Sequence, residues 1–278
     1  MKILIAADME GVTGVVCWDH VAPNHPEYAR FRKLMTEDVN AAIRGAFDAG
    51  AEEVLVSDGH SSGRNILIEA LDSRARLRCG SPSPLSMVSG VENGIDGVAF
   101  IGYHARIGTE NAILEHTWSD ERVADLRING QSVGETALNA AICGHFGTPV
   151  IMISGDQTVC AEAQAFLGEL ETAVVKIATG RMSAECFPPE VTGQRIHDAA
   201  FRAVTRLREG GNAGRSKVPP PLQFAAPLTM EIDFVQSEMT DKATQLPGAT
   251  REGRTIRYVA DDILTLFQAF RCALALAR

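Results

Sequence analysis

Short apolar runs alternate with longer helical patterns over the first two thirds of the chain. Four of these runs, rich in β-branched residues, predict strands at residues 2–7, 53–57, 97–102 and 150–154. They are apolar at nearly every position, which is typical of parallel strands that are covered on both faces. The alternation of strands and helices therefore indicates an α/β fold with a mostly parallel sheet flanked by helices.

Apolar residues recur at helical spacing in two long segments between these strands. They predict helices at residues 27–49 and 135–146, and a glycine suited to ending a helix follows each segment. Before the second helix, Asn129 and Gly130 separate two short apolar pairs, and this dipeptide favours a tight hairpin turn. The hairpin leads the chain into the helix that begins at Glu135.

The last third of the chain has a different pattern. Residues 210–227 combine glycine, serine and a run of three prolines with few bulky side chains, which predicts a linker or loop. Beyond it, the pattern predicts two strands and a final amphipathic helix, at residues 230–235, 255–259 and 261–277. We therefore expect a large α/β domain at residues 1–209 and a smaller C-terminal α+β subdomain at residues 228–278.

The composition excludes several classes of protein. The 278 residues carry a formal net charge of -9 and no run of Lys or Arg longer than two, so the chain lacks the basic surface of a nucleic-acid-binding protein. The apolar run at residues 3–7 is too short for a secretion signal or a membrane span, and we expect a cytoplasmic protein without a membrane partner. The six cysteines are far apart, which argues against disulfides and a cysteine-ligated zinc.

Carboxylate and imidazole side chains follow three of the predicted strands. Asp8 and Glu10 come directly after the first strand and point the same way, because side chains alternate in an extended segment. His60 follows the second strand and His104 follows the third, and ligands bind at the carboxyl ends of strands in open α/β sheets. Glu135, at the helix start, adds another carboxylate. Together these five residues form a set of nitrogen and oxygen donors for a metal ion, without sulfur.

This donor set suits Zn or Mn. Five ligands are too many for one closed tetrahedral zinc, but they suit two metal ions about 3.5–4 Å apart that share one carboxylate. Asp8, at the end of a central strand, is the expected bridge. Two such ions lower the pKa of a bound water, so the expected chemistry is attack by a metal-bound hydroxide.

Several short motifs contain or adjoin these donors. They are Ala7-Asp8-Met9-Glu10-Gly11, Asp58-Gly59-His60-Ser61, Gly102-Tyr103-His104-Ala105-Arg106, Glu115-His116, and Ile128-Asn129-Gly130 with Val133-Gly134-Glu135. In this order and spacing they resemble the bacterial zinc-dependent D-aminopeptidases of the DppA type. The likeness is close over residues 1–190 and looser towards the C-terminus. One position departs from the family motif, because Ala6 stands where that motif usually has Ser.

The resemblance implies an aminopeptidase that removes N-terminal amino acids, D-amino acids in this family, from short peptides or amides. It also implies a catalytic role for His116 outside the metal set and a ring-shaped homodecamer that encloses the active sites. The implied ligands of two zinc ions per chain are Asp8, Glu10, His60, His104 and Glu135. The same ligand types accept Mn or Co.

Two other functions stay open on the sequence alone. The segment Gly59-His60-Ser61-Ser62-Gly63 matches the G-x-S-x-G motif of serine hydrolases, which makes Ser61 an alternative nucleophile. A non-catalytic α/β protein that binds a metal or a small molecule also fits, since a fold does not fix a function.

A few more residues have two interpretations. Asp58 either orients His60 or caps the turn after its strand. Lys176 and Arg181 flank a turn after another strand and are interpreted either as carboxylate-binding residues or as exposed cations, and they receive no role. The apolar C-terminal residues are candidates for an interface between chains: Leu264, Phe267, Phe270 and Leu274.

Overall fold

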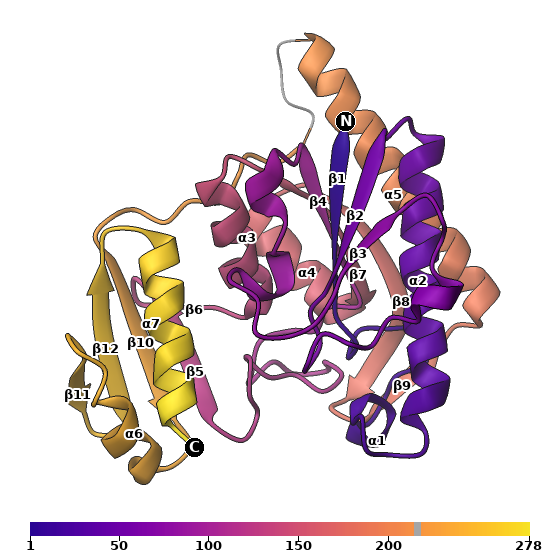
Figure 1. Ribbon diagram of the computed structural model, residues 1–278. Coiled ribbons are helices and arrows are strands. Elements are labelled where there is room, and N and C mark those ends of the chain that lie inside the picture. Colours follow the sequence, from indigo (N-terminus) through magenta and orange to yellow (C-terminus); the bar gives the residue numbers. More distant parts are fainter. Residues whose placement is uncertain (214–217) are drawn as a thin grey trace.

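The computed structural model describes residues 1–213 and 218–278 and contains two β-sheets (Figure 1). The strands of the larger one, sheet A, are β1 (Lys2–Ala7), β2 (Glu53–Asp58), β3 (Arg76–Arg78), β4 (Gly97–Ile101), β7 (Val150–Asp156), β8 (Glu171–Gly180) and β9 (Ser183–Cys186). Their order is β3-β2-β1-β4-β7-β8-β9, and all neighbours are parallel except β8 and β9. The expected α/β fold with a mostly parallel sheet is confirmed.

Helices cover both faces of sheet A (Figure 1). They are α2 (Tyr28–Asp48) and α5 (Pro189–Ala213) on one face, and α3 (Glu135–His145) and α4 (Gln157–Leu167) on the other. Ile3 and Ile5 of β1 pack in the core under α2 and α5, whereas Leu4 packs in the core on the opposite face. The continuous apolar run of β1 therefore fills two cores, because successive side chains of a strand point to opposite faces.

The smaller sheet, sheet B, is antiparallel. Its elements are β5 (Val123–Ile128), β6 (Gln131–Ser132), β10 (Leu228–Phe234), β11 (Thr250–Glu252) and β12 (Thr255–Ala260), with α6 (Ser237–Ala243) and α7 (Ile263–Leu276) packed on it. Its strand order is β11-β12-β10-β5-β6. Between β5 and β6, Asn129 and Gly130 have φ angles of 53° and 79°, so the expected hairpin turn is confirmed.

Sheet B joins segments that are far apart in the sequence. The expected C-terminal strands and helix are present, but β5 and β6 from the middle of the chain complete their sheet, and Met230 pairs with Ile128. Helix α5 continues to Ala213, past the expected start of the linker at residue 210. Part of that linker, residues 214–217, lies outside the described residues. The division into domains at residues 209 and 227 stays a prediction.

The apolar residues of α7 do not form an exposed interface. Phe267, Phe270 and Leu274 are buried in the core that sheet B shares with α3, and Leu264 is partly buried against it. The expectation that these residues supply a contact between chains was therefore wrong. The helix uses its apolar face to cover its own sheet, as an amphipathic helix normally does.

Short helical turns connect the longer elements. They are α1 (Trp18–Val21) and the 3-10 turns η1 (Ile68–Ala70), η2 (Ser86–Val88) and η3 (Val91–Asn93). Across the described ranges, no helix has the length and apolar character needed to cross a membrane. All six cysteines are free thiols, as their spacing predicted.

Candidate metal centre

The candidate site lies where the central strands β1, β2 and β4 end. The loops that follow β1 and β4 approach each other so closely that side chains are excluded. A Cβ atom on Gly102, which has a φ of +74°, would lie 2.3 Å from the carbonyl oxygen of Asp8, and one on Gly11 would lie 1.9 Å from that of Tyr103. Glycine at these two positions lets the loops carry Asp8 and His104 into one small space.

One cluster consists of Asp8, Glu10 and His60, whose ligand-type atoms all lie within 4.8 Å of one another. His60 Nδ1 lies 3.4 Å from Asp8 Oδ1 and 3.2 Å from Glu10 Oε2. The other ring nitrogen, Nε2, donates to the carbonyl oxygen of Val21 at 2.9 Å. That bond leaves Nδ1 of His60 to face the two carboxylates.

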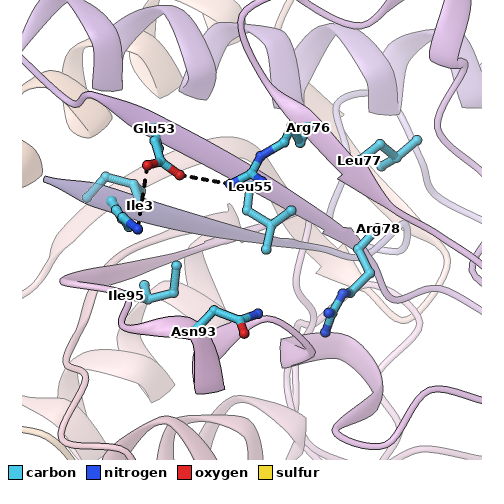
Figure 2. A pocket seen from close by; sticks show the side chains of 9 residues that line it. Ile3, Glu53, Leu55, Arg76, Leu77, Arg78, Asn93 and Ile95 are labelled. Carbon is cyan, nitrogen blue, oxygen red and sulfur yellow. Dashed lines mark hydrogen bonds and ion pairs between the residues drawn. The ribbon is translucent and has the colours of Figure 1, made fainter.

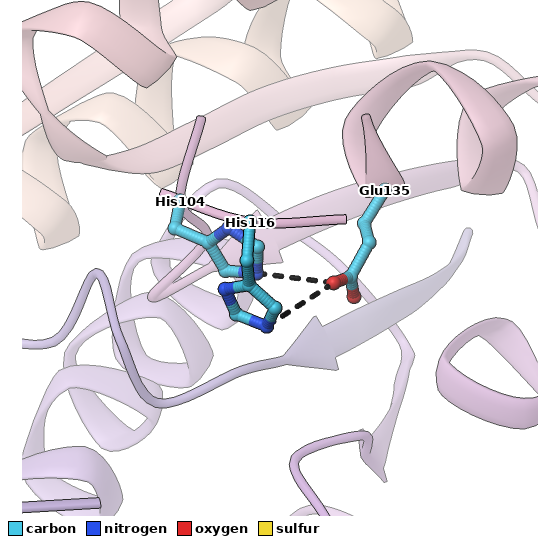
Figure 3. A group of neighbouring side chains, drawn as sticks. All are labelled: His104, His116 and Glu135. Carbon is cyan, nitrogen blue, oxygen red and sulfur yellow. Dashed lines mark ion pairs between the residues drawn. The ribbon is translucent and has the colours of Figure 1, made fainter. Parts of the chain in front are cut away.

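A second cluster consists of His104, His116 and Glu135 (Figure 3). His104 Nε2 lies 3.2 Å from Glu135 Oε1, and His116 Nε2 lies 3.7 Å from the same oxygen. The two imidazole rings stack with their centroids 4.0 Å apart. Each donates its Nδ1 proton to a backbone carbonyl, that of Ala105 for His104 and that of Leu114 for His116.

Asp8 connects the two clusters. Its Oδ1 faces His60, while its Oδ2 lies 3.4 Å from His104 Nε2. The backbone N–H of Met9 donates to Oδ1 and fixes the direction of the carboxylate. The structure therefore brings together all five predicted donors and His116, from loops and helices that are distant in sequence.

Several buried atoms of the site have no hydrogen-bond partner. Asp8 Oδ2, Glu10 Oε2 and His104 Nε2 are each shielded from solvent and form no hydrogen bond, although each lies within ion-pair distance of a neighbouring group of the site. Burying such groups without a partner costs free energy, so native proteins satisfy nearly all of them. A divalent cation coordinated by these oxygens and nitrogens would satisfy all three, so the residues fit a metal centre.

Burial and neighbouring charges shift the pKa values of these groups. Burial and the adjacent Glu10 raise the pKa of Asp8 to about 7. Burial opposes the charged form of His104, but Glu135 and Asp8 outweigh it and raise the pKa of His104 to about 10. Burial and the neighbouring His104 lower the pKa of His116. The carboxylates thus require positive charge beside them, which protonated histidines supply in the absence of a metal ion.

The site opens into a cavity of about 270 Å³. The cavity wall includes Asp8, Glu10, His60, His116 and Glu135 with their neighbours Ser61 and Trp118. Two further segments contribute Ser81, Ser86 and Arg271. A larger cavity of about 690 Å³ lies beside the amino ends of β1 and β2 (Figure 2). There, Glu53 pairs with Lys2 and Arg76. In the described part of the chain, two groups of residues could hold a metal ion, and all their members except the fully buried His104 line the smaller cavity.

Lys176 was misinterpreted from the sequence. It is fully buried in β8, and its Nζ donates to the carbonyl oxygens of Glu10, Val12 and Val15 at 2.7, 2.9 and 2.7 Å. Burial lowers its pKa to about 8. Lys176 thus holds the loop that carries Glu10. The signal was a single lysine within an apolar run, Ala173-Val174-Val175-Lys176-Ile177-Ala178.

Asp58 caps the turn after β2. Its carboxylate accepts hydrogen bonds from the backbone N–H groups of Asn65 and Ile66, at 2.6 and 2.8 Å, and from the Asn65 side chain at 2.6 Å. Asn65 also donates to the carbonyl oxygen of His60. Asp58 therefore shapes the turn that presents His60, and its recorded hydrogen bonds do not include the imidazole.

Ser61 lacks the local structure of a serine-hydrolase nucleophile. Its φ of 51° is the strained value of a sharp turn, and its side chain lines the cavity. The chain continues from Ser61 as a turn and loop to η1, without the helix that a nucleophile elbow requires. The serine-hydrolase alternative loses its structural context.

Comparisons with known proteins agree with the geometry. A family model described as D-aminopeptidase matches residues 1–272. A D-aminopeptidase of Bacillus subtilis (strain 168) is 32% identical over 271 residues, which cover 97% of this chain and 95% of that protein. A solved structure described as the Zn-dependent D-aminopeptidase DppA from Bacillus subtilis, a self-compartmentalizing protease, superimposes with a TM-score of 0.93 at 32% identity, covering 100% of this chain and 98% of that one.

Proposed function

Because the chain belongs to the D-aminopeptidase family, we propose that it removes N-terminal D-amino acids from short peptides or amides with two bound zinc ions. Membership of this family confirms the expected enzyme class, a metallo-aminopeptidase that hydrolyses peptide bonds. The proposed zinc ligands are Asp8, Glu10, His60, His104 and Glu135.

The observation that carries the proposal is the position of the Asp8 carboxylate between two histidines. One oxygen lies 3.4 Å from His60 Nδ1 and the other lies 3.4 Å from His104 Nε2. Each side offers one further carboxylate, from Glu10 or Glu135. This arrangement supports one ion on each side with Asp8 shared between them.

Zinc ions held by these residues would supply an activated water and polarise the carbonyl of the scissile bond. The residues of the chain bind and orient these ions and the substrate. Hydrogen bonds to the carbonyls of Val21 and Ala105 hold the His60 and His104 rings in fixed orientations. Burial of the carboxylates keeps bulk water away, which strengthens every electrostatic interaction within the site.

We assign proton transfer to His116. Its Nδ1 proton is bound by the Leu114 carbonyl, so Nε2 is the nitrogen that can take up a proton beside Glu135. Its lowered pKa favours the neutral, proton-accepting form at neutral pH. In this role His116 accepts a proton during attack on the carbonyl and donates it to the leaving amine. The alternative role for His116 is that of a zinc ligand. The zinc content of a His116 variant distinguishes the two roles.

We also propose that the chains assemble into a ring-shaped homodecamer that encloses the active sites. The support is the description of the related DppA as a self-compartmentalizing protease. Light scattering on the purified protein tests this assembly. A particle of ten chains is expected, and a monomer at micromolar concentration would reject an obligate ring.

Elemental analysis combined with an activity assay tests the function. The purified chain should hold about two zinc ions and hydrolyse D-alanyl amides in preference to L-alanyl amides. A chelator should abolish hydrolysis, and a phosphonylating reagent directed at serine should leave it unchanged. Activity that resists the chelator and is lost to the serine reagent would overturn the proposal in favour of Ser61.

A further inference from the structure

Arg271 is a cation in the wall of the metal-centre cavity, although it lies on the C-terminal helix α7. Its guanidinium donates one hydrogen bond, at 2.6 Å, to the carbonyl oxygen of Ser83. The Phe267 ring lies 5.8 Å from its Cζ and supports the side chain from the apolar side. Helix α7 and the Ser83 loop thus fix a guanidinium beside the catalytic residues.

The guanidinium has no carboxylate partner within the described residues 1–213 and 218–278. The bond to Ser83 occupies one of its five N–H donors. Asp8, Glu10 and Glu135 line the same cavity, but they contact the histidines and not Arg271. A partly buried guanidinium that has no anionic partner in the chain favours binding of an anion from outside the chain. The planar pair of N–H donors of arginine matches the two oxygens of a carboxylate.

The size of the cavity limits which anion can reach both Arg271 and the metal centre. A sphere of 270 Å³ would be about 8 Å across, and two extended residues span at most about 7 Å. The volume also lies just below the range of about 300–1,000 Å³ that is usual for ligand pockets. A dipeptide whose first carbonyl lies at the metal ligands therefore has a length close to that of the cavity, which keeps its terminal carboxylate in the space that Arg271 also lines.

We infer that Arg271 binds the C-terminal carboxylate of the substrate and makes the enzyme selective for dipeptides with a free C-terminus. This inference rests on the proposed aminopeptidase function, because it needs the scissile bond at the metal centre. It adds a specificity residue that the C-terminal part of the chain contributes to a site built on sheet A.

The test compares D-alanyl-D-alanine with its C-terminal amide as substrates of the zinc-loaded full chain. The wild type should hydrolyse the free dipeptide with a kcat/KM about 10- to 100-fold higher, the effect of one charge-assisted interaction. Arg271→Met should remove this preference, mainly through a higher KM for the free dipeptide, and change kcat/KM for the amide less than about twofold. Arg271→Lys should keep part of the preference, because lysine retains the positive charge but lacks the planar pair of N–H donors.

Arg122→Met is the matched control. Arg122 is also half-buried and also bonds a carbonyl, that of Leu274 in α7, at 2.9 Å, but it does not line the cavity. This variant should change kcat/KM for both substrates by the same factor. If Arg271→Met also lowered both equally, or if it kept the preference for the free dipeptide, Arg271 would be structural and the inference would be wrong.

A binding measurement separates this inference from the proposed function. A dipeptide analogue with a reduced peptide bond cannot be hydrolysed, and calorimetry can compare its carboxylate and carboxamide forms. Tighter binding of the carboxylate by the wild type and equal binding by Arg271→Met would support Arg271 even if no peptide were cleaved. Equal binding of both forms by the wild type would reject it, whereas absent hydrolysis would reject only the aminopeptidase function.

Discussion

The two cavities beside sheet A differ in the exposure and pairing of their charged side chains. In the larger one, at the amino ends of β1 and β2, Glu53 pairs with Lys2 and with Arg76, whose side chain is 73% exposed (Figure 2). In the smaller one, at the carboxyl ends, Asp8 and Glu10 are buried, and each keeps an oxygen without a hydrogen bond. Volume alone would select the larger cavity, whose lining residues belong to neither group that could hold a metal ion in the described part of the chain.

The charged side chains of the two cavities differ in how much they cost the fold in free energy. Exposed ion pairs form and break with little change in free energy, because water solvates both partners. Buried carboxylates that repel each other destabilise the fold unless something compensates them, and Glu10 does raise the pKa of Asp8. A site that carries such a cost is a candidate for function.

The largest expected effect belongs to Asp8→Ala. Because only Asp8 faces both clusters, this variant should lose both zinc ions and all measurable hydrolysis. His60→Ala and His104→Ala should each retain one ion in part, since each removes a ligand from one side only. Elemental analysis of the three purified variants measures this, and equal zinc loss in all three would contradict the bridging role.

His116→Ala should separate proton transfer from metal binding. We expect full zinc content and wild-type thermal stability, while kcat falls by about 10²- to 10⁴-fold, the range for loss of one general acid or base. Zinc analysis and steady-state kinetics on the same preparation check this. Loss of one zinc ion would instead make His116 a ligand, and near-normal turnover would leave it without a catalytic role.

Lys176→Met should destabilise the loop that carries Glu10. The variant leaves the buried carbonyls of Glu10, Val12 and Val15 without their donor, so the free energy of unfolding should fall by about 2–4 kcal/mol. Denaturant unfolding measures the change. Lys2→Met is the control from the other cavity and should stay within about 0.5 kcal/mol of the wild type. Equal stability of both variants would show that Lys176 is dispensable.

Glu53→Ala should have the smallest effect. Its partners Lys2 and Arg76 are largely exposed, so loss of both ion pairs should change the free energy of unfolding by less than about 1 kcal/mol. Zinc content and hydrolysis should match those of the wild type. A loss of activity in this variant would give the larger cavity a functional role and end the contrast between the two.

Local patterns in the sequence predicted strands of both sheets, but they did not predict how the strands of sheet B pair. The apolar run of residues 2–7 and its parallel neighbours follow from local periodicity. Asp8 and His104 were expected at the same edge of the sheet because each follows a parallel strand. The pairing of β5 with β10 joins residues about a hundred positions apart, such as Ile128 and Met230, and no local pattern encodes such a contact. The same long-range packing buries Phe270 of α7.

The sequence predicted the site residues that directly follow strands. It did not predict the residues whose role depends on how they are buried in the folded protein. The family resemblance and the enzyme class are confirmed, while the roles of the individual ligands and of His116 stay predictions. Lys176 was missed because lysine is rarely buried, so the usual interpretation is an exposed one. Arg271 was missed because it reaches the site from α7, which comes near the metal-centre cavity only in the folded protein.

Anomalous diffraction from zinc-loaded crystals, measured on both sides of the zinc absorption edge, tests the central claim most directly. We predict two peaks per chain, about 3.5–4 Å apart, with the Asp8 carboxylate between them. One peak should lie beside Glu10 and His60, and the other beside His104 and Glu135. A single peak, or two peaks that do not share Asp8, would contradict the dinuclear account.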